Sequence, residues 1–166
     1  MNITDFQSLT PIDYGWSGDK KYYAVTPDGT PYFVRITSRQ RGDRFAKLFD
    51  LQKAVAATGI PMCAPVAIGE CKEGVYAIHS WIDGVDAEAA VPTLPAEVQY
   101  KLGRDAGQYP TRIHSIPAPE DQPDWEARFN AKIDRKIRMY SECPIKFDGA
   151  DALLDYIDAK IPDIYP

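Results

Sequence analysis

The sequence predicts an α+β fold, in which a mostly antiparallel sheet and one packed helix precede a helical part. Two strand patterns joined by the turn Pro27–Thr30 come early, and two further apolar strand patterns follow one helical pattern. After Asp83-Gly84 only helical patterns remain. Runs of strands followed by runs of helices are typical of α+β folds or of separate domains. We therefore expect one lobe over residues 1–82, and a hinge with an incomplete helical lobe over residues 83–166.

The strands of the first lobe begin with a short segment that is expected to end near Tyr14. Lys20–Val25 and Tyr32–Thr37 are rich in aromatic and β-branched residues, which favour strands. Asp28-Gly29 between them supplies the positive φ of a hairpin turn. These two segments are therefore predicted to pair as a hairpin.

The first helix is expected over Arg41–Thr58, because its apolar residues recur at helical spacing. Gly59 follows as a C-terminal stop signal. Two apolar strands, Met62–Gly69 and Val75–Ile82, complete the first lobe.

Three further helices are predicted after the hinge: Pro95–Ile113, Trp125–Tyr140 and Asp151–Ile161. Pro110 falls within the first of them and is expected to kink or divide it, because proline lacks the N–H that a helix interior uses.

Composition excludes several classes of function. A net charge of −5 and a pI of about 5.0 give no overall field that attracts nucleic acid or an anionic membrane. No apolar run approaches the roughly 20 residues of a membrane span, and no signal peptide follows Met1. The three cysteines are odd in number and lack metal-ligand spacing, which indicates free thiols in the cytoplasm.

Arg35 is the candidate functional residue of the hairpin, since a cation in the middle of a strand is unusual. Strand alternation places it on one face with Phe33 and Thr37. It is either an edge residue with its head in water or a cation that faces a cleft and binds phosphate oxygens. Asp50 interrupts the apolar face of the predicted first helix, and we expect it to pair with Arg35.

Two other segments are candidates for ligand contact. Gly15–Asp19 is a glycine-containing loop whose free N–H groups could hold an anion, although most such turns bind nothing. Ile78–Gly84 is either a hinge whose backbone contacts a flat heterocyclic ligand or a simple connection between two domains.

The basic run Lys20–Lys21 and a cluster at Arg39, Arg41 and Arg44 are either solvated surface or anion sites. The two histidines are far apart, so we expect no metal site.

Taken in order, the segments GWSGDKKYY, YFVRIT, TGIPMCAPVAIGEC, VYAIHSWIDG and LGRDAGQYPTRIHSIPAP resemble the aminoglycoside phosphotransferase family, which has a protein-kinase-like fold. The resemblance implies a kinase-like N-terminal lobe, a hinge and a partial C-terminal lobe. It also implies transfer of the γ-phosphate of ATP or GTP to a small-molecule hydroxyl, as in antibiotic resistance.

The resemblance also assigns roles to individual residues. Arg35 stands where the family has a lysine that touches the α- and β-phosphates, and Asp50 lies near the place of the acidic residue that pairs with it. Phe33 would stack on adenine, and the backbone of Ser80 and Ile82 would contact its edge. The implied nucleotide-binding residues are therefore Ser17 and Gly18 over the phosphates, Phe33, Arg35, Asp50, Ser80 and Ile82.

One motif of the family is missing, since the sequence contains no His-Gly-Asp catalytic loop. We therefore expect a fragment without catalytic or metal-binding residues, inactive alone, to which Mg²⁺ would bind only together with the missing part. The alternatives are a natural non-catalytic module that binds nucleotide or a partner, and a structural domain that only mimics this order. Helices that lack their partners would also favour self-association.

Overall fold

The structure is a computed structural model that describes residues 1–164, with the backbone alone described for residues 161–164. The chain divides into two compact units, Met1–Pro117 and Ala118–Pro166. The predicted lobe boundary between residues 82 and 83 falls inside the first unit and stays a prediction.

Secondary structure follows the predicted order closely. The elements in chain order are η1 (Ile3–Asp5), β1 (Ser8–Pro11), β2 (Lys20–Val25), β3 (Pro31–Thr37), η2 (Arg39–Arg41), α1 (Gly42–Ala57), β4 (Pro65–Cys71), β5 (Gly74–Ser80), α2 (Ala87–Ala90), η3 (Val91–Thr93), α3 (Ala96–His114), α4 (Trp125–Ser141) and α5 (Ala150–Ile164).

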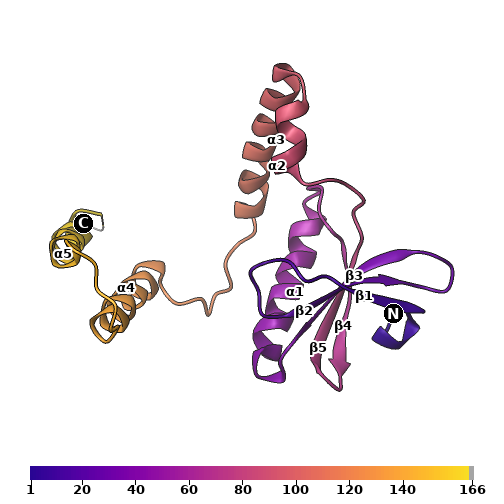
Figure 1. Ribbon diagram of the computed structural model, residues 1–166, viewed down its shortest axis with the longest axis horizontal. Coiled ribbons are helices and arrows are strands. Elements are labelled where there is room, and N and C mark those ends of the chain that lie inside the picture. The colour runs from indigo at the N-terminus through magenta and orange to yellow at the C-terminus, as the bar shows by residue number, and fades with distance from the viewer. Residues whose placement is uncertain (165–166) are drawn as a thin grey trace. The chain divides into compact units, whose positions relative to one another are not determined.

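A five-stranded antiparallel sheet in the order β1-β2-β3-β5-β4 forms the centre of the first unit (Figure 1). The predicted hairpin is confirmed: Lys20 pairs with Ile36 and Lys21 with Arg35. At its turn Gly29 has φ +86°, and the Thr30 N–H donates to Asp28 Oδ1 at 3.1 Å. The Asp-Gly pair therefore closes the turn in the way its chemistry predicts.

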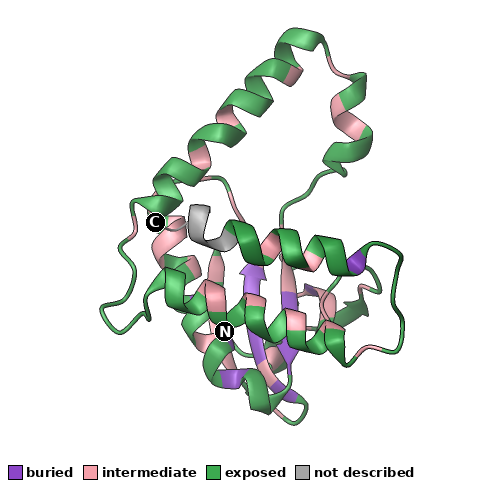
Figure 2. Cartoon of the chain, turned by 90° about the vertical axis from the view of Figure 1, so that its left-hand side faces the viewer, coloured by how far each residue is buried: buried purple, intermediate pink, exposed green. Residues whose placement is uncertain are grey.

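One face of the sheet carries the main apolar core. Figure 2 colours its residues purple together with the other buried residues of the strands. The buried residues of this core come from the three central strands, and the N-terminal segment packs on them through Ile3 and Phe6. Tyr76 Oη also donates to Asn2 Oδ1 at 2.9 Å. The buried core residues are Ala24, Val34, Ile36, Tyr76 and Ile78.

The other face of the sheet packs against α1. Phe45 and Phe49 of α1 are buried against Ala77 of β5. The predicted alternation in β3 is confirmed, because Val34 and Ile36 belong to the opposite core while Phe33 and Arg35 line a hollow beside α1.

Gly74 permits a close approach of two strands at the start of β5. Its φ is +149°, and a Cβ atom at this position would overlap the carbonyl oxygen of Thr37. Only glycine fits this backbone, which fixes the ends of β3 and β5 against each other.

The segment after β5 differs in two details from the prediction. The short α2 and η3 were not expected, and α3 runs unbroken from Ala96 to His114 with Pro110 inside it. Of the two expected effects of Pro110, a kink or a division, the division is wrong, because a proline removes one hydrogen bond of the helix and the remaining ones hold it together; the kink stays a prediction. No residue of α3 is buried.

The second unit consists of α4 and α5 in the part that the structure describes. Between them lies a mostly apolar groove of about 410 Å³, to which Ile133, Ile137 and Leu154 contribute. Among the helices of residues 1–164, none combines the length and the apolar character that crossing a membrane would require.

Candidate functional site

Arg35 lies on the face of the sheet that α1 covers, at the edge of a hollow of about 220 Å³ between β3, β5 and α1. Its Cζ atom is 5.3 Å from the centre of the Phe45 ring, a cation–π distance. The side chain is 30% exposed. Arg35 therefore combines a packed stem with a guanidinium group that a ligand can reach.

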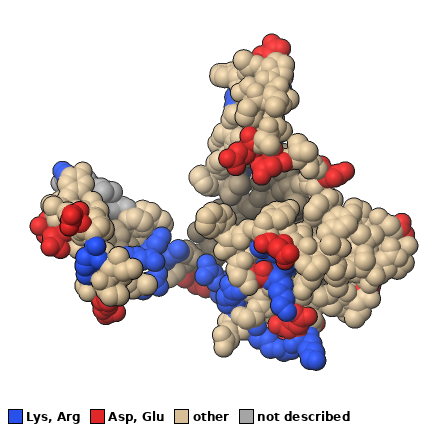
Figure 3. All heavy atoms as spheres, in the orientation of Figure 1, with Lys and Arg blue, Asp and Glu red and all other residues tan. Residues whose placement is uncertain are grey.

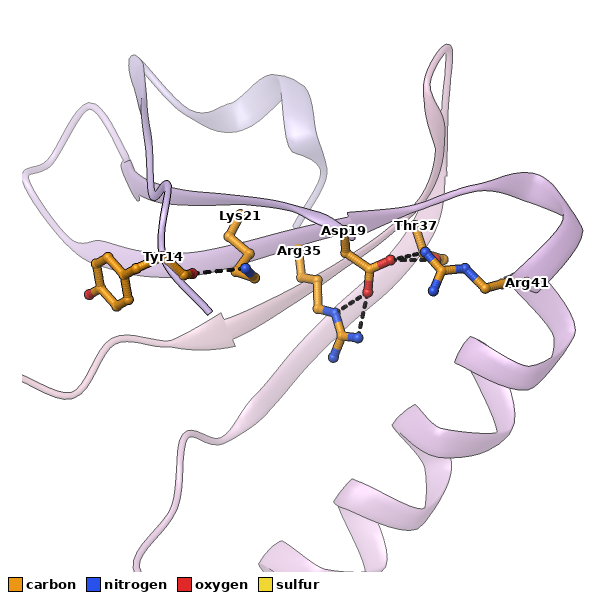
Figure 4. Close-up of polar contacts among 6 residues, drawn as sticks. All are labelled: Tyr14, Asp19, Lys21, Arg35, Thr37 and Arg41. Carbon is orange, nitrogen blue, oxygen red and sulfur yellow. Dashed lines mark hydrogen bonds and ion pairs between the residues drawn. The ribbon is translucent and has the colours of Figure 1, made fainter. Parts of the chain in front are cut away.

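Asp19 is the carboxylate that holds Arg35, as Figure 4 shows. Its Oδ2 atom accepts from Arg35 Nε at 2.6 Å and also contacts Arg35 Nη2. Its Oδ1 atom accepts from Thr37 Oγ1 at 2.9 Å and from Arg41 Nη2. With a side chain only 1% exposed, Asp19 joins the end of the glycine loop, β3 and the turn before α1.

The predicted partner of Arg35 is therefore wrong. Asp50 has a 74% exposed side chain and pairs with Lys53 on its own helix, at 3.3 Å. It follows the buried Phe49 in α1, and successive helix residues point in directions about 100° apart. The residue lies on the solvent side of the helix and does not interrupt its packed face.

The charge of Asp19 is stabilised by its neighbours. Burial alone would raise the pKa of Asp19, but the hydrogen bonds from Arg35 and Thr37, with the charges of Arg35 and Arg41, outweigh burial and lower the pKa below its ordinary value. The carboxylate is therefore ionised at neutral pH and anchors both guanidinium groups.

The hairpin register could have revealed this contact. It pairs Lys20 with Ile36, and one further step places Asp19 opposite Thr37 and diagonal to Arg35, on the same face. The register therefore points to the acidic residue that ends the glycine loop, and not to one on the following helix, as the partner of Arg35.

Phe33 lines the same hollow as Arg35 and lies opposite His79 in the strand register. The two ring centres are 6.2 Å apart. His79 is buried and its Nε2 atom is 3.0 Å from Gln52 Oε1. Burial first, and then the charge of Arg35, lower the pKa of His79, so this side of the hollow is a neutral aromatic surface.

The glycine loop forms a separate, more polar hollow of about 340 Å³ to which Ser17, Gly18 and Lys21 contribute. Gly15 has φ +109°, which favours glycine there. The Lys21 Nζ atom donates to the Tyr14 carbonyl at 2.8 Å and so braces the loop (Figure 4).

The segment after β5 leaves regular structure at the predicted hinge. The Ser80 N–H donates to the Ala64 carbonyl at 2.9 Å, and Ser80 Oγ accepts from the Ala64 N–H at 2.8 Å. Ile82 lies beyond the strand and is 54% exposed. The Ser80 N–H is therefore engaged within the protein, whereas its carbonyl and the Ile82 backbone are the groups to consider for a ligand.

Charged side chains concentrate near the site. In Figure 3, most of the Lys and Arg atoms visible on the sheet and α1 lie toward the lower end, next to acidic side chains. Within residues 1–164, no group of three or more His, Cys, Asp or Glu side chains could hold a metal ion. The arrangement suits an anion with a flat apolar group attached, because cations and aromatic rings share one face.

Known proteins are similar to this chain both in sequence and in fold. The sequence model of the phosphotransferase enzyme family matches residues 8–163. A comparison with curated proteins gives no match. The fold is similar to a solved structure described as the GDP and kanamycin complex of APH(2")-IIia, with a TM-score of 0.54 and 17% identity. The match covers 95% of this chain and 53% of the other, so this chain spans about half of that structure's length. The predicted fold class and family resemblance are thereby confirmed.

Proposed function

We propose, because this chain belongs to the phosphotransferase enzyme family, that it carries the nucleotide-binding part of an enzyme that phosphorylates a small-molecule hydroxyl. In this proposal ATP or GTP donates its γ-phosphate. The sheet face beside α1 binds the nucleotide, and Arg35 contacts its phosphates.

The observation that carries the proposal is the anchored guanidinium of Arg35. Asp19 holds its Nε and Nη2 atoms, and within the described residues its Nη1 atom has no partner. Lys21 lies directly opposite in the strand register, but its Nζ atom donates to the Tyr14 carbonyl and, within the described residues, forms no bond with Arg35. A bound phosphate would accept the remaining N–H groups of Arg35.

The base would lie next to Phe33, inside the hollow beside α1. An aromatic ring offers a stacking surface for a purine, and His79 extends that surface from the neighbouring strand. The Ser80 carbonyl and the Ile82 N–H would then contact the edge of the base. Ser17 and Gly18 would cover the phosphates from the glycine loop.

Phosphoryl transfer needs positioned groups and metal-borne charge in addition to nucleotide binding. The sequence holds no His-Gly-Asp motif, and the described residues offer no cluster of carboxylates for Mg²⁺. We therefore assign no catalytic residue and no metal ligand to this chain. Alone, it is expected to bind MgATP or MgGTP without transferring phosphate.

The remaining features of the proposal concern partners. The substrate would be a small molecule with a hydroxyl group, such as an aminoglycoside. The biological role would then be antibiotic resistance, and the protein would act in the cytoplasm. Neither nucleic acid nor a membrane is a proposed partner. Self-association through the exposed apolar side chains of α3, such as Leu102, is also proposed, with analytical ultracentrifugation as its test.

Thermal melting with and without nucleotide tests the proposal. The wild-type chain is expected to melt at a higher temperature with MgATP or MgGTP, because a ligand that binds only the folded state stabilises it. Arg35→Ala should lose this increase. Arg35→Lys should keep part of it, because the cation remains while the forked contact with Asp19 is lost.

Arg39→Ala is the matched control, since Arg39 pairs with Glu70 on the neighbouring surface. It is expected to melt with the same nucleotide-dependent increase as the wild type. If neither nucleotide changes the melting temperature of the wild-type chain, the proposal fails. If the increase survives in Arg35→Ala, the phosphate role of Arg35 is wrong.

A further inference from the structure

Three arginines line one hollow where α1 begins, and two of them, Arg35 and Arg41, bind the carboxylate of Asp19. Arg35, Arg41 and Arg44 line a hollow of about 190 Å³ together with Asp19, Thr37, Phe45 and Leu48. The three guanidinium groups and the single carboxylate leave two positive charges uncompensated in this small space. Such an excess of one sign attracts an oxyanion.

Asp19 cannot balance this charge, because its four contacts already occupy both carboxylate oxygens. Arg35 binds one oxygen, while Thr37 and Arg41 bind the other (Figure 4). Arg41 is itself 52% exposed, so its other N–H groups can be reached from solvent. Asp19 therefore orients two guanidinium groups and leaves each with donors to spare.

Arg44 is the cation with least compensation. It is exposed, and no ion pair involving it is found in the part of the chain that the structure describes. The nearest acidic residue in sequence, Asp43, lines a different hollow together with Arg39. No side chain caps the N-terminus of α1, and Asp43 in its first turn offsets the positive end of the helix, so the arginines themselves supply the excess charge.

We propose that Arg41 and Arg44, together with Arg35, bind a phosphate group at the start of α1. This goes beyond the proposed function, which places Arg35 and the glycine loop on the nucleotide phosphates but neither Arg41 nor Arg44, and the two proposals share Arg35. Guanidinium groups suit this role because their paired N–H groups match two oxygens of one phosphate. The phosphate is either the terminal one of the nucleotide or that of a separate phosphate ester.

Calorimetric titration of the full chain with inorganic pyrophosphate tests the site. The wild type is expected to bind pyrophosphate, and Arg44→Gln to bind it about 10-fold more weakly, as loss of one charge-assisted contact implies. Arg39→Gln is the matched control: it removes the same charge five residues away, from an arginine that pairs with Glu70 at 3.2 Å and donates to the Cys71 carbonyl at 3.0 Å. Its affinity should change by less than about twofold.

A second titration, after saturation with MgATP or MgGTP, identifies the source of the phosphate. Loss of pyrophosphate binding would assign the site to the nucleotide's own phosphates, and unchanged binding would assign it to a separate phosphate ester; both support the site. Pyrophosphate binding without nucleotide binding would keep the site and reject the proposed function. The site itself is overturned if the wild type does not bind pyrophosphate, if Arg44→Gln binds equally well, or if Arg39→Gln loses as much.

Discussion

Replacing Asp19 by Asn should destabilise the protein more than any other single change of a carboxylate in the first unit. Asn keeps the shape of the side chain but removes the charge that two guanidinium groups share. It also places an amide N–H₂ group where one of the carboxylate oxygens accepts hydrogen bonds. Arg35 and Arg41 would then face each other without a counter-ion.

The magnitude follows from the exposure of the partners. Breaking a fully buried ion pair costs about 3–5 kcal/mol, and exposed pairs contribute about 1 kcal/mol or less. Asp19 is 1% exposed, but Arg35 is 30% and Arg41 52% exposed, so water compensates both cations in part. We therefore expect the free energy of unfolding to fall by about 2 kcal/mol, between those two limits.

Urea unfolding of the wild type, Asp19→Asn and Asp50→Asn measures this effect. Asp50 is the matched control, because it is the same residue type with a 74% exposed side chain and one partner on its own helix. Its substitution should change the free energy of unfolding by less than about 0.5 kcal/mol. A loss of similar size in both variants would refute the assignment of Asp19 as the anchor.

The pH dependence of the same experiment gives an independent check. The pKa of Asp19 is lowered in the folded state, so its contribution to stability is complete above the ordinary aspartate pKa of about 4. The contribution is lost as the pH falls through the lower, folded-state pKa. The difference between wild type and Asp19→Asn should therefore be largest at neutral pH and shrink at pH 3 and below. A difference that grows on acidification would contradict this linkage.

Three further predictions concern the fold around the site. Gly74→Ala should lower the free energy of unfolding by more than about 2 kcal/mol, because its Cβ atom would overlap a carbonyl of β3, whereas Gly84→Ala, with open space around it, should be nearly neutral. Phe49→Ala should cost about 3 kcal/mol in chemical denaturation, and Leu51→Ala, which is 49% exposed, clearly less. The free energy of unfolding of the wild type should fall as the pH drops below about 6.5, because His79 takes up a proton more readily in the unfolded state than in the folded state, where its pKa is lowered. In melting experiments at different pH, His79→Leu should reduce this dependence of stability on pH. An unchanged dependence would contradict the role of His79.

The sheet and its covering helix could be predicted from the sequence because local signals agreed with one another. Three local signals predict the same hairpin: the Asp28-Gly29 turn, the alternation in Lys20–Val25 and the aromatic pattern of the return strand. The observed β2 has the predicted bounds, and the predicted faces of β3 are those found. The first helix is shorter than predicted by one residue at each end.

The partner of Arg35 could not be read from the same signals, because it depends on how strands align in space. Asp50 was expected from its place within an apolar helical pattern, yet its side chain is on the solvent side of α1. Asp19 ends a polar loop, where an acidic residue carries no pattern of its own. Its burial depends on the hairpin register and on the turn before α1, which brings Arg41 to it.

The segment after the hinge shows the same difference between local and tertiary information. Helix α3 exists where its periodicity predicts it, but Pro110 does not divide it. Whether a helix continues through a proline depends on the hydrogen bonds on either side of it, and the sequence pattern does not show how strong these are. The backbone groups of Ser80 were likewise expected to be available, and only the structure shows that its N–H is engaged by Ala64.

Calorimetric titration with a nucleotide and with its nucleoside tests the central claim most directly, because the difference between the two isolates the phosphate contacts. The wild-type chain should bind MgATP or MgGTP more tightly than adenosine or guanosine. Arg35→Gln should reduce that difference by about 10-fold while changing nucleoside affinity little, as the loss of one charge-assisted phosphate contact implies. Equal affinities of the wild type for nucleotide and nucleoside, or a difference that persists in Arg35→Gln, would contradict the assignment of this sheet face to nucleotide binding.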